Sequence, residues 1–163
     1  MNSQTWWYLS RASGIVAWVL LTVACLWGVL MVTRMLKPAD RPAWMLDLHR
    51  WLGALSVITT GVHLAALVAD NYVHFGWAEI LVPQASEWKR WPVTMGVIAF
   101  YILIVVEASS LLMKKLPRPV WHGIHLTAYI SFVLATAHGV YAGTDRKNLF
   151  FVILGSGMAS IVV

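Results

Sequence analysis

The stretch DLHRWLGALSVITTGVHLA, residues 47–65, is mostly apolar but carries two histidines, His49 and His63, placed 14 residues apart. On an α-helix these imidazoles differ by about 40° around the axis and by about 21 Å along it. Ionisable side chains inside membrane helices are costly and usually face the bundle interior, so each is a candidate functional residue. The stretch therefore predicts a membrane helix with imidazoles on one face at two depths.

The whole chain has the composition of an integral membrane protein. Of its 163 residues, 60% are hydrophobic and 12% are charged, and the mean hydropathy is +0.71. A membrane-spanning helix needs roughly 20 mostly apolar residues. Such runs predict one all-α domain over residues 1–163, a bundle of about five transmembrane helices at 12–33, 47–69, 93–113, 121–142 and 149–163. The last run is short for a span, which implies a truncated helix or a tilted one completed by a partner membrane subunit.

The positions of lysine and arginine predict the orientation of this bundle. Helices that alternate in direction place seven basic residues on one side and five on the other. The first side holds Arg34, Lys37, Arg41, Arg50, Lys114, Lys115 and Arg118, and the second holds Arg11, Lys89, Arg90, Arg146 and Lys147. Because short cytoplasmic loops are enriched in these residues, the first and third connections are expected inside and the N-terminus outside. The net charge of +5 is then explained by topology and anionic lipid, with no indication of nucleic acid binding.

The expected helix at 121–142 repeats the arrangement with His125 and His138, which are 13 residues apart. Since this helix and the one at 47–69 run in the same direction, His49 shares a level with His125, and His63 shares the other level with His138. Two imidazoles facing one another at each of two depths suit an iron porphyrin at each level. Zinc normally requires three or four clustered ligands, and a proton relay would not require matched pairs.

Two features of this helix remain open. Thirteen residues leave His125 and His138 about 140° apart, so the helix must tilt, bulge or present them to opposite flanks. A π-bulge near Ser131 or Gly139 would be one solution. In addition, His122 competes with His125, because it too lies at the helix entrance.

Other residues of interest are an acid, two bases and two glycines. Glu107 is the only acid well inside an expected span; we expect it to pair with a base such as Lys114 or Arg50, or else to accept a proton. Arg11 and Arg50 are candidates for neutralising haem propionates, with lipid headgroup binding as the alternative. Gly53 and Gly61 flank the ligand face, where a small residue would admit a flat macrocycle or permit helix packing.

Several motifs resemble one known family. LHRWLG followed by TTGVH, and LPRPVWHGIHLTAY followed by LATAHGVYAGTD, resemble the ferric reductase-like transmembrane domain. That family includes NADPH oxidases, ferric reductases and the haem-binding membrane subunit of the bacterial periplasmic methionine sulfoxide reductase system. The segment YLSRASGIVAW is similar to the opening helix of bacterial members, which implies a bacterial inner (plasma) membrane. The resemblance covers nearly the whole chain.

The resemblance implies two b-type haems, each held by two histidines. His49 with His125 would bind the haem on the cytoplasmic side, and His63 with His138 the outer one. The register of the family's W-x-x-x-H motif selects His125 in preference to His122. Family members take electrons on the cytoplasmic side, which agrees with the orientation expected from the charges.

The chain also departs from many members of that family. We expect no further N-terminal helix and no C-terminal flavin and nicotinamide domain, and these 163 residues contain no G-x-G-x-x-G or Walker-type loop. The electron donor must then be a separate reductase, a quinol or a separately bound flavin. We therefore expect a b-type cytochrome, an oxidoreductase component that moves electrons to an extracytoplasmic acceptor. The alternatives are a haem-binding anchor or assembly subunit of a larger redox complex without its own turnover, and a haem-free channel or transporter.

Overall fold

The computed structural model describes residues 3–34, 43–70 and 75–143, and all of its regular structure is helical. The helices are α1 (Ser3–Thr33), α2 (Ala43–Ala69), α3 (Trp77–Leu81), α4 (Arg90–Leu111), α5 (Arg118–Leu126) and α6 (Ala128–Ala142). Four stretches of the described chain are long and apolar enough to cross a membrane: Gln4–Thr33, Ala43–Ala69, Arg90–Leu111 and Arg118–Ala142. The prediction of an all-α membrane bundle is confirmed. The fifth expected helix, 149–163, lies outside the described residues.

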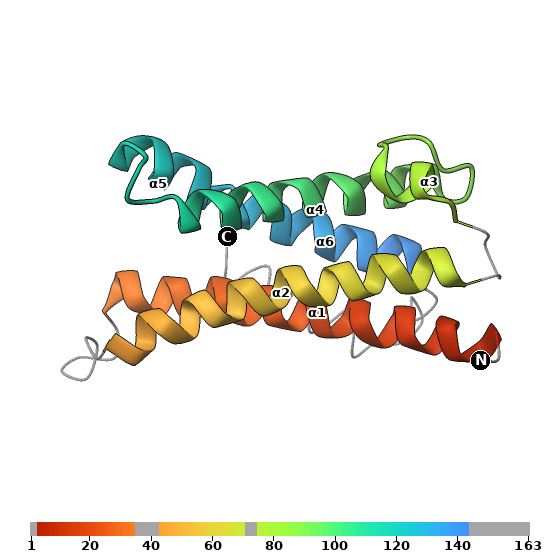
Figure 1. Cartoon of the computed structure of the whole chain (residues 1–163), viewed down its shortest axis with the longest axis horizontal. Helices are drawn as coiled ribbons and strands as arrows, with labels where there is room; N and C mark the ends of the chain where they lie inside the picture. Colours follow the sequence, from red (N-terminus) through yellow and green to blue (C-terminus); the bar gives the residue numbers. More distant parts are fainter. Residues whose placement is uncertain (1–2, 35–42, 71–74, 144–163) are drawn as a thin grey trace.

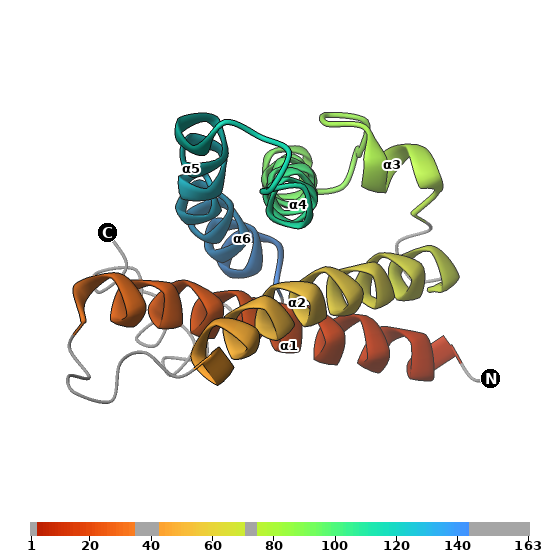
Figure 2. The same cartoon turned by 60° about the vertical axis from the view of Figure 1, so that its left-hand side comes forward.

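The long helices form two antiparallel pairs (Figures 1 and 2). The first pair is α1 with α2, and the second pair is α4 with the α5–α6 segment. The second pair crosses the first pair at an angle (Figure 2). The N-terminus, the end of α2, α3 and the end of α6 lie at one end of the bundle (Figure 1). As a result α2 and α6 approach one another from different pairs, and both run toward the same end.

Each helix begins earlier than the apolar pattern predicts. We expected starts near residues 12, 47 and 93, whereas α1 begins at Ser3, α2 at Ala43 and α4 at Arg90. Apolar runs mark the part of a helix that lies in hydrocarbon, but the backbone hydrogen bonds of a helix continue whatever the polarity of its side chains. Pro92 is accommodated because a proline in the first turn of α4 removes no intrahelical hydrogen bond.

The expected helix at 121–142 is divided at Thr127 into α5 and α6. The Thr127 N–H donates to the carbonyl of Ile124, three residues back, at 3.0 Å, and its Oγ1 donates to the same carbonyl at 2.6 Å. Three-residue hydrogen bonding rotates the chain by about 120° per residue, against about 100° in an α-helix, which reduces the offset between His125 and His138. The irregularity therefore lies at Thr127, and the described Ser131 and Gly139 lie within the regular helix α6.

Buried side chains hold α6 at a fixed depth between its neighbours. Phe132 is fully buried in a cluster with Trp18, Leu21, Cys25 and Leu103. The Trp18 indole donates to Thr136 Oγ1 at 2.9 Å, linking α1 to α6. Ser131 Oγ donates to the Ala99 carbonyl of α4 at 2.8 Å. Helices in lipid associate through such close packing and interhelical hydrogen bonds, so the level of α6 is well determined.

Candidate functional site

Four of the histidines form two facing pairs inside the bundle. The ring centres of His49 and His125 lie 5.8 Å apart, with 70° between the ring planes. Those of His63 and His138 lie 6.4 Å apart, with 77° between the planes. Helix α2 supplies one member of each pair, whereas α5 supplies His125 and α6 supplies His138. The two pairs, called here the 49/125 pair and the 63/138 pair, are separated by about 21 Å of helix.

The separation within each pair would allow a single metal ion to be held between the two imidazoles. Imidazole nitrogens bind first-row metals at about 2 Å, and the ring centre lies roughly 1 Å further, so two axial imidazoles have ring centres about 6 Å apart. Both pairs match this value. Among the described residues no group of three or more His, Cys, Asp or Glu side chains is placed to hold a metal ion. This part of the chain thus offers two-ligand sites, which suit a metal already held in a macrocycle.

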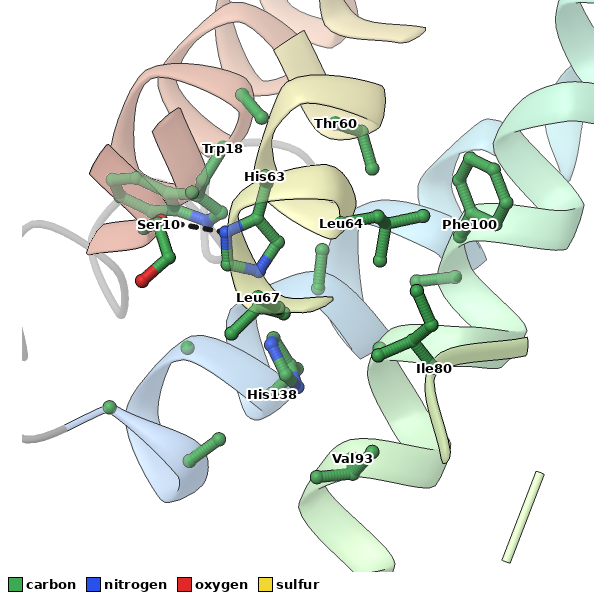
Figure 3. Close-up of a pocket in the computed structure, with 18 of the residues that line it drawn as sticks. Ser10, Trp18, Thr60, His63, Leu64, Leu67, Ile80, Val93, Phe100 and His138 are labelled. Atoms are coloured by element: carbon green, nitrogen blue, oxygen red, sulfur yellow. Dashed lines mark hydrogen bonds between the residues drawn. The ribbon is translucent and has the colours of Figure 1, made fainter. Parts of the chain in front are cut away.

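Hydrogen bonds fix the tautomer of the 63/138 pair. His63 Nδ1 lies 2.7 Å from the carbonyl oxygen of Ser10 on α1 (Figure 3). His138 Nδ1 lies 2.9 Å from the carbonyl oxygen of Pro92 on α4. A carbonyl oxygen only accepts, so each Nδ1 must carry the hydrogen, which leaves the lone pair on Nε2. Metal-binding histidines commonly use this arrangement, which orients the ring and makes it more basic.

The 49/125 pair has a weaker set of partners. His125 Nδ1 lies 3.3 Å from Ser110 Oγ on α4, and the Trp121 indole stacks on the His125 ring with centres 5.2 Å apart. His49 Nδ1 is buried and has no hydrogen-bond partner among the residues that the structure describes. The backbone of Ala24 on α1 lies near this nitrogen, but the contact does not meet hydrogen-bond geometry. The ring of His49 is therefore held mainly by packing.

A cavity of about 280 Å³ adjoins the 63/138 pair. Its walls are mainly apolar, and side chains of α1, α2, α3, α4 and α6 contribute to it. In Figure 3 His63 and His138 approach one another beside Leu64, Leu67 and Phe100. Apolar walls around two basic nitrogens exclude water and leave room for a flat hydrophobic group.

The remaining candidates from the sequence occupy different surroundings. His122 is exposed, and among the described residues it is His125 that faces His49. Arg50 is also exposed, with its guanidinium 3.5 Å from Asp47. Arg11 lines the cavity, with its guanidinium 4.3 Å from the centre of the Trp7 ring. Of the two arginines proposed for propionates, Arg11 is the one beside the histidine cavity.

The ion pair expected for Glu107 is not formed within the described residues, and its role as a proton acceptor stays a prediction. Its carboxylate packs against Gly53, where an added Cβ would lie 2.7 Å from Oε2. Lys114 and Arg50 do not pair with it, and no other described residue forms an ion pair with it. Gly53 thus makes room for a carboxylate, and an added Cβ at Gly61 would meet nothing within 4 Å. Neither glycine lies against a histidine of the two pairs.

Three other glycines lie against these histidines and were not predicted from the sequence. An added Cβ at Gly14 would be 3.0 Å from His63 Nδ1, one at Gly96 would be 2.7 Å from His138 Nδ1, and one at Gly28 would be 3.5 Å from His49 Cε1. Gly14 and Gly28 repeat on α1 the 14-residue spacing of His49 and His63 on α2. That shared spacing is the signal that could have identified Gly14 and Gly28 from the sequence.

The contact between Ser110 and His125 supports a first prediction. If the 49/125 pair binds a metal porphyrin, Ser110→Ala should weaken that binding by less than about tenfold, because a 3.3 Å contact is longer than a strong hydrogen bond and full loss of such a partner costs about 10–100-fold. Titration of the purified protein with the porphyrin measures this. Ser109→Ala is the matched control, since both hydroxyls bond the Val106 carbonyl of their own helix whereas the contact with His125 comes from Ser110. Equal effects of the two changes would remove Ser110 from the site.

A family model described as ferric reductase like transmembrane component matches residues 13–136. This match begins within α1, covers α2, α3, α4 and α5, and ends within α6. It contains His49, His63 and His125, whereas His138 lies two residues beyond it. The comparisons with curated proteins and with solved structures gave no match.

Proposed function

Because the chain belongs to the ferric reductase-like transmembrane component family, we propose that its two histidine pairs hold two b-type haems that carry electrons across the membrane. The family is one of membrane proteins that bind haem and transfer electrons. The observation that carries the finer assignment is the separation of the paired rings, 5.8 Å and 6.4 Å, which suits an iron between them. His49 and His125 hold one haem in this proposal, and His63 and His138 hold the other.

The protein's own residues have three tasks in this proposal. The imidazoles supply neutral Nε2 donors, and at the 63/138 pair the carbonyls of Ser10 and Pro92 hold them in that tautomer. The apolar walls exclude water, and Arg11 offers a positive charge at the cavity. When bound, haem iron changes by one electron between its ferric and ferrous states, at a potential set by axial ligands, burial and nearby charge.

We further propose that electrons enter at the 49/125 pair, on the cytoplasmic side, and leave at the 63/138 pair. The excess of lysine and arginine in the first and third connections supports this orientation. A separate reductase, a quinol or a bound flavin would be the donor. The acceptor would meet the cavity of the 63/138 pair, which is lined by the N-terminal part of α1 and by α3.

Optical spectroscopy of the detergent-purified protein tests the proposal. We expect reduced-minus-oxidised bands of low-spin b-type haem, at two haems per chain, because both pairs have the ring separation of axial ligands. A preparation that takes up no haem when reconstituted with hemin would overturn the proposal and favour the haem-free bundle.

Reoxidation kinetics then separate an electron carrier from a structural subunit. The dithionite-reduced protein should be reoxidised by ferric chelates, oxygen or quinones in a reaction whose rate rises with acceptor concentration. Haems that stay reduced with all three acceptors would indicate an anchor or assembly subunit without its own turnover.

A further inference from the structure

Two of the four histidines are held by the same local device on two different helices. On α1 the carbonyl of Ser10 accepts from His63, and four residues later stands Gly14. On α4 the carbonyl of Pro92 accepts from His138, and four residues later stands Gly96. Each imidazole of the 63/138 pair thus packs on a helical turn with the same arrangement, a carbonyl acceptor at residue i and a glycine at residue i+4.

Helix geometry explains why a glycine four residues after the carbonyl favours this contact. The carbonyl of residue i already accepts from the N–H of residue i+4, so a second donor must approach from the side. A helical Cα–Cβ bond tilts toward the N-terminus, and the side chain of residue i+4 therefore lies over the turn that contains carbonyl i. Other donors still reach helical carbonyls past a side chain, as Ser131 Oγ reaches the Ala99 carbonyl with Leu103 four residues later. At Ser10 and Pro92 the imidazole lies directly against residue i+4, so a glycine there makes room for the ring.

The clearances show how closely the rings fit. At Gly96 an added Cβ would lie 2.7 Å, 2.9 Å and 3.0 Å from three ring atoms of His138, so the ring would have to move. At Gly14 it would lie 3.0 Å from two ring atoms of His63. A ring that moves away from the glycine would also lengthen its hydrogen bond, because the carbonyl that it contacts lies one turn before the same glycine.

We propose that Gly14 and Gly96 are positioning residues, which expose the Ser10 and Pro92 carbonyls so that His63 and His138 present Nε2 to a common iron. This inference rests on the proposed function, because it assigns the glycines a role toward the haem of the 63/138 pair. The 49/125 pair contains a looser version, in which Gly28 follows Ala24 by four residues and an added Cβ would be 3.5 Å from His49. That distance is an ordinary contact, so an alanine fits there.

Three alanine substitutions form the test, each made in the full-length protein reconstituted with hemin. Gly96→Ala should weaken binding of one haem by about 10–100-fold, and Gly14→Ala by about tenfold, the range for loss of a partner that orients a metal ligand. The control Gly61→Ala should bind both haems within about twofold of the parent, because an added Cβ there meets nothing within 4 Å. Alanine is the better helix former, so a loss at Gly96 does not arise from a weaker helix.

The second haem reports whether each variant is folded. In Gly96→Ala the haem proposed for the 49/125 pair should remain bound. The double variant with His49→Ala should then lose that haem as well. The low-spin ferric EPR signal of the affected haem should also shift in Gly14→Ala, since its g-values depend on ligand ring orientation. If Gly96→Ala loses both haems, the result for Gly14→Ala decides between the two explanations. Loss of both haems in Gly14→Ala as well would overturn the proposal that each glycine positions one histidine. Loss of one haem in Gly14→Ala would support it.

The inference and the proposed function fail in different ways. If the parent protein takes up no haem, the proposed function fails before any glycine is changed. If the parent binds two haems and Gly96→Ala and Gly14→Ala behave like Gly61→Ala in affinity and EPR, the glycine inference alone is wrong.

Discussion

Replacing His63 or His138 by alanine is expected to leave one haem per chain in place of two. Each change removes one of two imidazoles whose ring centres lie 6.4 Å apart, and a haem held from one side only loses its low-spin spectrum and much of its affinity. The haem-to-protein ratio and the reduced-minus-oxidised spectrum measure the result. Retention of two low-spin haems in either variant would refute the ligand assignment.

A second substitution keeps this experiment informative if the alanine variants do not fold. His138→Met retains an axial donor of similar length, and haem held by histidine and methionine has a higher potential than haem held by two histidines. We therefore expect His138→Met to keep both haems and to raise the potential of one. An unchanged potential with two haems bound would show that residue 138 is not a ligand.

The second large effect is expected at the other end of the bundle, where two neighbouring histidines behave differently. His125→Ala should remove the haem of the 49/125 pair, because His125 faces His49 with ring centres 5.8 Å apart. His122→Ala should leave both haems in place, because the His122 side chain is exposed. Haem content of the two variants, purified side by side, measures the contrast. A reversed result would assign the ligand to His122 and require α5 to rotate.

Much of this architecture could be predicted from the sequence. The long apolar runs require helices in lipid, and equal directions for the helices of His49 and His125 put matched histidines at matched depths. The structure brings together the same two pairs, and their role as haem ligands stays a prediction. The starts of the helices were placed too late, because hydropathy records contact with lipid and does not record backbone hydrogen bonding, whereas the expected ends at residues 33, 69 and 142 agree with the structure.

The details that orient the rings could not be predicted in the same way. The acceptors for His63 and His138 are main-chain carbonyls, which every residue carries and which leave no mark in the sequence. Gly14 and Gly96 matter only through the neighbouring helix that packs on them. The expected ion pair of Glu107 was wrong because its interhelical neighbour is Gly53, which carries no charge and leaves no recognisable pattern in the sequence.

The turn at Thr127 separates the two helices that carry His125 and His138. The regular hydrogen-bond ladder is interrupted there, whereas α6 is held by the burial of Phe132 against Trp18. Under the proposed function, a movement of α5 would therefore alter the surroundings of His125 and leave those of His138 in place.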